Sequence, residues 1–214
     1  MYRFHFNGYP CLQNSDLNSD YIMNTTVAIF PGRFQLPHKG HKYVYDCLTQ
    51  LFGKCYIATS NHVDFKNNSP LNFKEKKQLL TYLGIPRNLI IETREPYRPY
   101  EIYQKIPKQK SIIVGIGDKD KRRFNALKST SYFKDYKTSD PNNLNTKDQN
   151  AYLVYVPTYR YTFMGESIQS GTQLRNRYIN LPYNEQKDFI FKLYETYNTR
   201  LHAMLSKRLE VYYD

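Results

Sequence analysis

Residues 27–41 read VAIFPGRFQLPHKGH, and they combine three local signals. The apolar run 27–30 suits a buried strand, and the Pro-Gly pair that follows ends it in a turn. Arg33, His38 and His41 come next, directly before a helical pattern of apolar residues. Free amides at the start of a helix attract anions, and guanidinium and imidazole groups add hydrogen-bond donors. The stretch therefore predicts a phosphate site between a strand and a helix.

The composition is that of a globular protein with a basic surface. Of the 214 residues, 40% are hydrophobic and 23% are charged, which suits one main domain with a sizeable core. The net charge of +12 favours anionic partners such as nucleotides, polyphosphate or nucleic acid. The basic residues are spread through the chain without an Arg/Lys block, so a solvated basic surface is favoured over a nucleic-acid groove.

The cysteines and the lengths of the apolar runs indicate in which cellular compartment the protein is expected. Cys11, Cys47 and Cys55 include no CxxC pair, so they suggest neither a disulfide framework nor a zinc ribbon, and they fit a reducing compartment. The N-terminus carries no apolar run long enough for a signal peptide, and no run has the length of a membrane span. We therefore expect a cytoplasmic protein with no membrane partner.

Strand and helix patterns alternate along the chain. A strand, helix, strand unit implies a right-handed crossover, so the pattern predicts an α/β fold with a doubly wound parallel sheet. Residues 1–23 are expected to form an irregular N-terminal arm, 24–183 the main domain, and 184–214 a C-terminal helix that packs on the domain or extends it. Residues 129–150 predict an exposed insertion. The expected strands are 27–30, 55–60, 88–93, 111–116 and 152–156. The expected helices are 73–83, 100–106 and 184–209, together with a first helix that ends near 53 and another that begins at 170.

Two further stretches carry candidate binding residues. The segment QSGTQLR places Ser170 and Thr172 at a helix start and Arg175 one turn later, an arrangement that can grip a polyphosphate. By itself this pattern is more often an ordinary capped helix. Gly117 and Asp118 follow the strongest buried-strand signal, SIIVGI, at the edge where open α/β sheets bind ligands. We interpret them as nucleotide-pocket residues, with a surface turn as the alternative. The same segment lacks the third glycine of a dinucleotide motif, and the chain has no Walker A pattern.

GRFQLPHKGH resembles the HxGH signature of the nucleotidylyltransferase superfamily, and its GRFQ opening is most similar to nicotinamide mononucleotide (NMN) adenylyltransferases of the archaeal and bacterial type. The resemblance implies a Rossmann-like nucleotidylyltransferase fold in which His38 and His41 hold the phosphates of a nucleoside triphosphate. SGTQLR is similar to the family's ISGTxxR motif, which gives Ser170, Thr172 and Arg175 the role of holding the triphosphate tail. Four more residues are implied in nucleotide or phosphate binding: Gly32, Arg33, Phe34 and Gly40.

A third segment, SPLNFKEK, resembles the family's NPFTxxER motif beside the acceptor-substrate site. It implies an acceptor role for Pro70 and Glu75, while an amphipathic helix with a solvated face is the alternative. Lys76 replaces the family's arginine, which keeps the charge but loses the forked geometry. A second departure lies in the first motif, because the family reads Gln-Pro-Phe-His where this chain has Gln35-Leu36-Pro37-His38.

The resemblance implies that AMP passes from ATP to a phosphorylated acceptor, with Mg²⁺ bound to the phosphates. With NMN as acceptor the products are NAD and pyrophosphate, and His38, His41 and Arg175 are the implied catalytic residues. Cytidylyltransferase and phosphopantetheine adenylyltransferase activities stay open, as does a non-catalytic nucleotide-binding module. A homo-oligomer is compatible with the resemblance, whereas nucleic acid is a less favoured partner. The histidine pair could also bind a metal, but no third ligand of suitable spacing follows, so phosphate binding is favoured.

Overall fold

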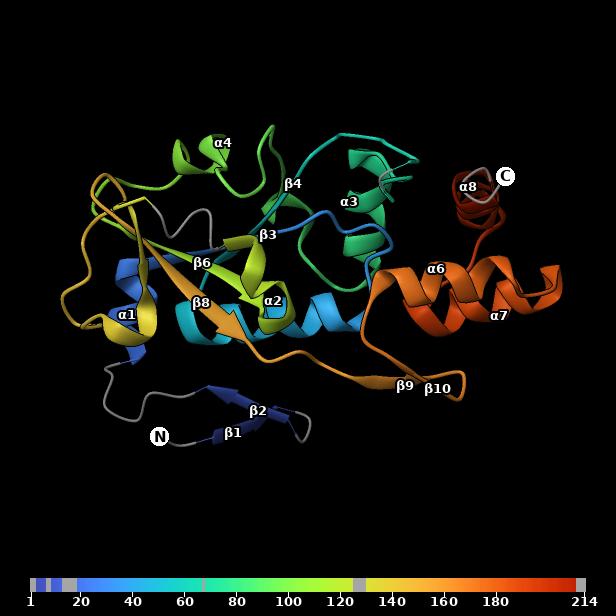
Figure 1. The fold of residues 1–214 in the computed structure, drawn as a ribbon, viewed down its shortest axis with the longest axis horizontal. Helices are drawn as coiled ribbons and strands as arrows, with labels where there is room; N and C mark the ends of the chain where they lie inside the picture. Colours follow the sequence, from blue (N-terminus) through green and yellow to red (C-terminus); the bar gives the residue numbers. More distant parts are fainter. Residues whose placement is uncertain (1–2, 7–8, 13–18, 67, 125–129, 211–214) are drawn as a thin grey trace.

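A computed structural model describes residues 3–6, 9–12, 19–66, 68–124 and 130–210. Its centre is a six-stranded sheet in which all pairings are parallel (Figure 1). This confirms the predicted α/β class with a doubly wound parallel sheet. The strand order across the sheet is β5 (Ile90–Glu92), β4 (Cys55–Thr59), β3 (Thr26–Pro31), β6 (Ser111–Gly117), β8 (Ala151–Val156) and β7 (Phe133–Asp135).

The two central strands, β3 and β6, are buried along their whole length. Such strands read as continuous apolar runs because helices or loops cover both faces of a parallel sheet. The chain leaves β3 towards β4 on one side and later returns to β6 on the other. Connections that diverge in this way open a crevice at the carboxyl ends of the two strands. The fold therefore places the loop after β3 and the segment after β6 at one ligand-binding edge.

Different helices cover the two faces of the sheet. On one face Ala28, Ile57 and Ile113 pack against α1 (Ser19–Thr25), α2 (Lys39–Phe52) and α3 (Phe73–Tyr82). On the other face Val114 and Leu153 pack against residues of α4 (Tyr100–Tyr103) and the turn that follows it. Short 3-10 helices complete the domain: η1 (Arg87–Leu89), η2 (Asp118–Phe124) and η3 (Tyr136–Thr138).

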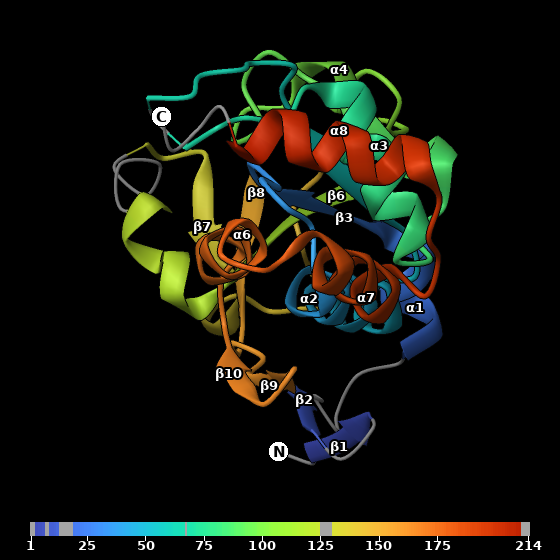
Figure 2. The same cartoon turned by 90° about the vertical axis from the view of Figure 1, so that its right-hand side faces the viewer.

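The C-terminal region lies beside the sheet (Figures 1 and 2). Its side chains form a separate apolar cluster. It contains the hairpin β9 (Tyr161–Phe163) and β10 (Glu166–Ile168) and the helices α6 (Gly171–Ile179), α7 (Tyr183–Tyr194) and α8 (Thr199–Glu210). The prediction of one helix over 184–209 was wrong. α7 ends before Glu195, which has a left-handed conformation with φ of 54°. At the start of α8, Asn198 Oδ1 accepts a hydrogen bond from the Leu201 amide. The apolar period continued through this break, which hid it from the sequence.

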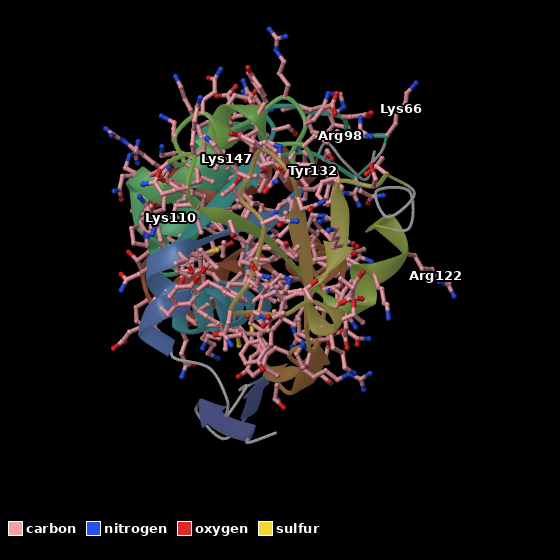
Figure 3. All side chains as sticks on the ribbon, turned by 90° about the vertical axis from the view of Figure 1, so that its left-hand side faces the viewer. Lys66, Arg98, Lys110, Arg122, Tyr132 and Lys147 are labelled. Atoms are coloured by element: carbon pink, nitrogen blue, oxygen red, sulfur yellow. The ribbon has the colours of Figure 1, made fainter. Side chains whose placement is uncertain are left out.

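Two other segments contain more regular structure than the sequence predicted. Within the arm 1–23, β1 (Arg3–Phe6) and β2 (Tyr9–Leu12) form an antiparallel hairpin, and α1 begins before the arm ends. Within 129–150, β7 extends the sheet as an edge strand. Lys147 connects this insertion to α4, since its ammonium donates to the carbonyl of Tyr103 at 2.6 Å and to that of Ile106 in the turn after α4. Tyr132 donates to the Lys147 carbonyl at 2.7 Å. Figure 3 labels Lys147 and Tyr132.

The cysteines differ from the expectation. Cys47 takes part in a disulfide, whereas Cys55 is a buried free thiol whose pKa is raised by burial. The sequence did not indicate this bond because no paired cysteine spacing points to it. Among the described residues, no helix combines the length and the apolar character needed to cross a membrane.

Candidate active site

A cavity opens at the carboxyl ends of β3 and β6, where the sheet topology predicts a ligand site. Its wall combines the loop after β3, the first turn of α2, the start of η2 and the N-terminus of α6. These segments lie up to 140 residues apart along the chain. The structure brings ten of the predicted site residues into this wall: Gly32, Arg33, Phe34, His38, Gly40, His41, Gly117, Ser170, Thr172 and Arg175.

The two histidines form the N-terminal cap of α2. The Gly40 amide donates to His38 Nδ1 at 3.0 Å, and the His38 amide donates to His41 Nδ1 at 3.2 Å. A backbone N–H can only donate, so both Nδ1 atoms carry lone pairs and the ring protons reside on Nε2. The rings lie 4.0 Å apart between centroids. The cap therefore gives both imidazoles one tautomer, with Nε2–H as the remaining donor.

Both imidazoles are neutral at ordinary pH. Burial lowers the pKa of His38 well below its usual range, and repulsion from a protonated His41 and from the positive charges of Lys119 and Arg175 lowers it further. Burial and Lys119 lower the pKa of His41 to about 3. His38 is 2% exposed, and its Nε2 has no hydrogen-bond partner within the described part of the chain. A buried donor without a partner is costly, so this atom is suited to an acceptor brought in by a ligand.

At two positions a neighbouring group lies so close to the backbone that only glycine fits. A Cβ at Gly40 would lie 2.8 Å from Cε1 of the His38 ring. A Cβ at Gly171 would lie 2.7 Å from the carbonyl oxygen of Gln35. The glycine of each motif thus permits a contact that any larger residue would push apart. The second contact seats the N-terminus of α6 directly on the loop after β3.

Arg175 links three segments of the cavity wall. It is 3% exposed, and its guanidinium donates to the Gln35 carbonyl at 2.5 Å, to Thr172 Oγ1 at 3.1 Å and to Asn68 Oδ1 at 3.4 Å. Gln35 in turn exchanges hydrogen bonds with the backbone of Leu71. The arginine predicted to hold a triphosphate is therefore positioned by the loop after β3 and by the 60–72 loop. Such a network fixes a planar donor before a ligand arrives.

The loop after β3 has an unusual backbone that explains one departure from the family motif. Phe34 and Leu36 are both left-handed, with φ of 46° and 69°. Proline is restricted to φ near −65°, so it is excluded at position 36, where the family has it. Leu36 is completely buried in the C-terminal apolar cluster. Burial of this side chain holds the strained loop in place, and nothing in the sequence signalled the left-handed turns.

Three predicted site residues do not line the cavity. Asp118 lies beside it and accepts a hydrogen bond from Thr158, which does line the cavity. Pro70 is buried. Glu75 accepts the Asn72 amide at 2.8 Å as part of the cap of α3 and pairs with Arg208 Nε of α8, also at 2.8 Å. The contacts of Glu75 are thus those of a helix cap, and its acceptor role stays a prediction.

Sequence reasoning missed several residues of the wall. Lys119 and Asp120 belong to η2, and Tyr97 and Thr158 come from loops after β5 and β8. The signal available for the first two was the GDKD run directly after the strongest strand. Tyr97 and Thr158 carried no motif, because their placement depends on the lengths of loops and not on local pattern.

The structure also bears on the metal-site alternative for the histidine pair. No group of three or more His, Cys, Asp or Glu side chains in the described residues is arranged to hold a metal ion. Both Nδ1 atoms are occupied by the helix cap. Among the described residues of the cavity wall, Asp120 supplies a carboxylate.

The chain is similar to known proteins in structure but not detectably in sequence. No protein-family model and no curated protein matches it. It resembles a bifunctional NMN adenylyltransferase/ADP ribose pyrophosphatase from Francisella tularensis over 88% of its length, with 16% identity and a TM-score of 0.50. The chain spans about half of that protein, 51%. The match shows that the two proteins share a fold.

Two further structures match. The Francisella tularensis protein in complex with AMP and a manganese ion matches at 17% identity and a TM-score of 0.47, over 88% of this chain and 51% of that one. A candidate nicotinate-nucleotide adenylyltransferase from Vibrio parahaemolyticus matches at 16% identity and a TM-score of 0.45, over 89% of this chain and 97% of that one.

Proposed function

We propose that this protein is a nucleotidylyltransferase that transfers AMP from ATP to a phosphorylated acceptor, with NMN as the first candidate. The observation that carries the proposal is the convergence of His38, His41 and Arg175 on one cavity at the carboxyl edge of the sheet. The shared fold with an NMN adenylyltransferase supports the same choice. The HxGH and SGTxxR motifs, which resemble those of the superfamily, supply these three residues.

In the proposed reaction a phosphate oxygen of the acceptor forms a bond to the α-phosphorus of ATP. The bond from that phosphorus to the bridging oxygen breaks, and its electron pair leaves with pyrophosphate. The nucleophile is already an anion, so the site mainly needs donors and cations at fixed positions. The Nε2–H groups of His38 and His41 are donors of this kind, because their tautomers are set by the cap of α2. Arg33 and Arg175 supply positive charge towards the leaving group.

The site also fits a Mg²⁺ ion that enters with ATP. Magnesium in phosphoryl-transfer sites is usually held by one or two carboxylates together with substrate phosphates and water. Asp120 is a carboxylate in the wall of the cavity and would be its protein ligand. When bound, the ion would offset part of the charge of the polyphosphate.

The identity of the acceptor and of the base is tested by a substrate screen. The purified protein would be incubated with ATP or CTP and with NMN, nicotinate mononucleotide, phosphopantetheine or glycerol phosphate, and released pyrophosphate would be measured. The proposal expects release with ATP and one of the nucleotide acceptors. Release with CTP or phosphopantetheine would instead identify one of the alternative transferases.

The His41→Ala variant provides the control for contaminating activity. It removes one predicted donor, so the release rate should fall on the order of 100-fold. If no combination of substrates yields pyrophosphate in the wild-type protein, the enzymatic proposal fails. A non-catalytic nucleotide-binding module would then describe the protein better.

A further inference from the structure

Lys119 is a cavity-lining residue that also contacts the segment before α6. It lies in η2, directly after the carboxyl end of β6, and it is one of the residues that line the cavity. Its ammonium donates to the carbonyl of Gln169, the residue before the N-cap of α6. The side chain is exposed, so a ligand in the cavity can reach it. Lys119 therefore both lines the cavity and contacts the segment that leads into α6.

The positive charge of Lys119 acts on both histidines. Its positive charge contributes to lowering the pKa of His38 and of His41, so its ammonium lies within electrostatic range of both rings. The charged groups around these rings in the cavity wall are Arg33, Arg175 and Lys119 as cations and Asp120 as an anion. Because the imidazoles are neutral, the described wall carries a net excess of positive charge without them. An anionic ligand would neutralise that excess.

We propose that Lys119 is a further phosphate-binding residue, whose ammonium contacts the polyphosphate tail between the histidine cap and the N-terminus of α6. The proposal rests on the proposed function, since it assumes that the cavity takes a nucleoside triphosphate. A lysine is a point charge with three donors, so it can keep its bond to Gln169 while another donor contacts a phosphate oxygen. Burial and this charge together keep the imidazoles neutral, which preserves each Nδ1 as the acceptor of a backbone amide in the α2 cap.

A set of substitutions distinguishes the effect of the Lys119 charge from that of its hydrogen bond to Gln169. Lys119→Gln keeps a donor for the Gln169 carbonyl but removes the charge, and Lys119→Arg keeps the charge. Lys121→Gln is the matched control, because Lys121 is exposed in the same 3-10 helix, lies over the Tyr155 ring at 5.0 Å and does not line the cavity. Titration calorimetry would measure binding of inorganic pyrophosphate and of ATP to each folded variant.

The expected result is that Lys119→Gln weakens binding of both ligands on the order of tenfold, the loss typical of one charge-assisted hydrogen bond. Lys119→Arg should restore most of the affinity, and Lys121→Gln should leave it unchanged. Equal affinity of Lys119→Gln and wild type would overturn the proposal and leave Lys119 as a positioning residue for α6. If the wild-type protein binds neither ligand, the proposed function fails first, and the two failures are thereby distinguished.

Discussion

Gly40→Ala tests whether the His38 imidazole must keep its position. A Cβ at residue 40 would lie 2.8 Å from His38 Cε1 and 2.9 Å from Nδ1. These distances are well inside van der Waals contact, so the ring has to rotate away from α2. The rotation breaks the hydrogen bond from the residue 40 amide to Nδ1, and it also moves Nε2, the donor that the proposed function assigns to the ligand.

The effect on stability should be small because two contributions oppose each other. Alanine in place of glycine inside a helix stabilises by about 0.5–1 kcal/mol. Loss of the cap hydrogen bond costs about 0.5–1.5 kcal/mol. The net change in the free energy of unfolding should therefore stay within about 1 kcal/mol. Displacing a donor from a developing charge has a larger effect, on the order of 100-fold in turnover.

Pyrophosphate release at saturating ATP measures turnover, and urea unfolding measures stability. Gln50→Ala is the matched control, since Gln50 is exposed near the end of the same helix and touches no part of the cavity. We expect the control to retain both properties and Gly40→Ala to lose only turnover. A folded Gly40→Ala protein with the wild-type rate would refute the claim that the geometry of His38 places a catalytic donor.

Three other predictions follow from the same geometry. Arg175→Lys should keep the fold but weaken ATP binding on the order of tenfold, because a lysine cannot reproduce the forked contacts; calorimetry checks this. Leu36→Pro should unfold at lower urea than Leu36→Ala, since both lose the buried side chain but only proline is barred from φ of 69°. Stability should fall as pH drops from 6.5 towards 3, because the unfolded chain binds a proton at His41 that the folded chain, in which the His41 pKa is about 3, does not. The lowered pKa of His38 adds to this fall, so His41→Gln should reduce the pH dependence in urea titrations without abolishing it.

The parallel sheet and the cavity were predictable because their signals are local and strong. Buried strands read as apolar runs, and a glycine turn between a strand and a helix indicates the edge of an α/β sheet where ligands bind. The loop after β3 and the N-terminus of α6 were therefore assigned from short motifs. Their meeting in space comes from the structure, where Gly171 at the start of α6 lies against the carbonyl of Gln35.

The remaining features depend on contacts that no local pattern encodes. The break at Glu195 lies inside a continuous apolar period, and the strain at Leu36 is held by packing against distant helices. Glu75 matched a family motif, yet its carboxylate is engaged by the α3 cap and by Arg208, more than 130 residues later. Contacts with residues distant in the sequence determine such positions, so a motif match alone does not predict the contacts of a residue.

Under the proposed function, a histidine at the cap of α2 serves both the fold and the chemistry. Serine or aspartate would cap a helix equally well through one oxygen. Aspartate would repel a phosphate, and serine has no second group that extends into the cavity. An imidazole accepts a backbone amide at Nδ1 and still presents a donor at Nε2, and burial keeps it uncharged. Replacing His38 by Asn should therefore preserve the cap more than the activity, because the shorter amide can accept the same backbone bond but cannot reach as far into the cavity.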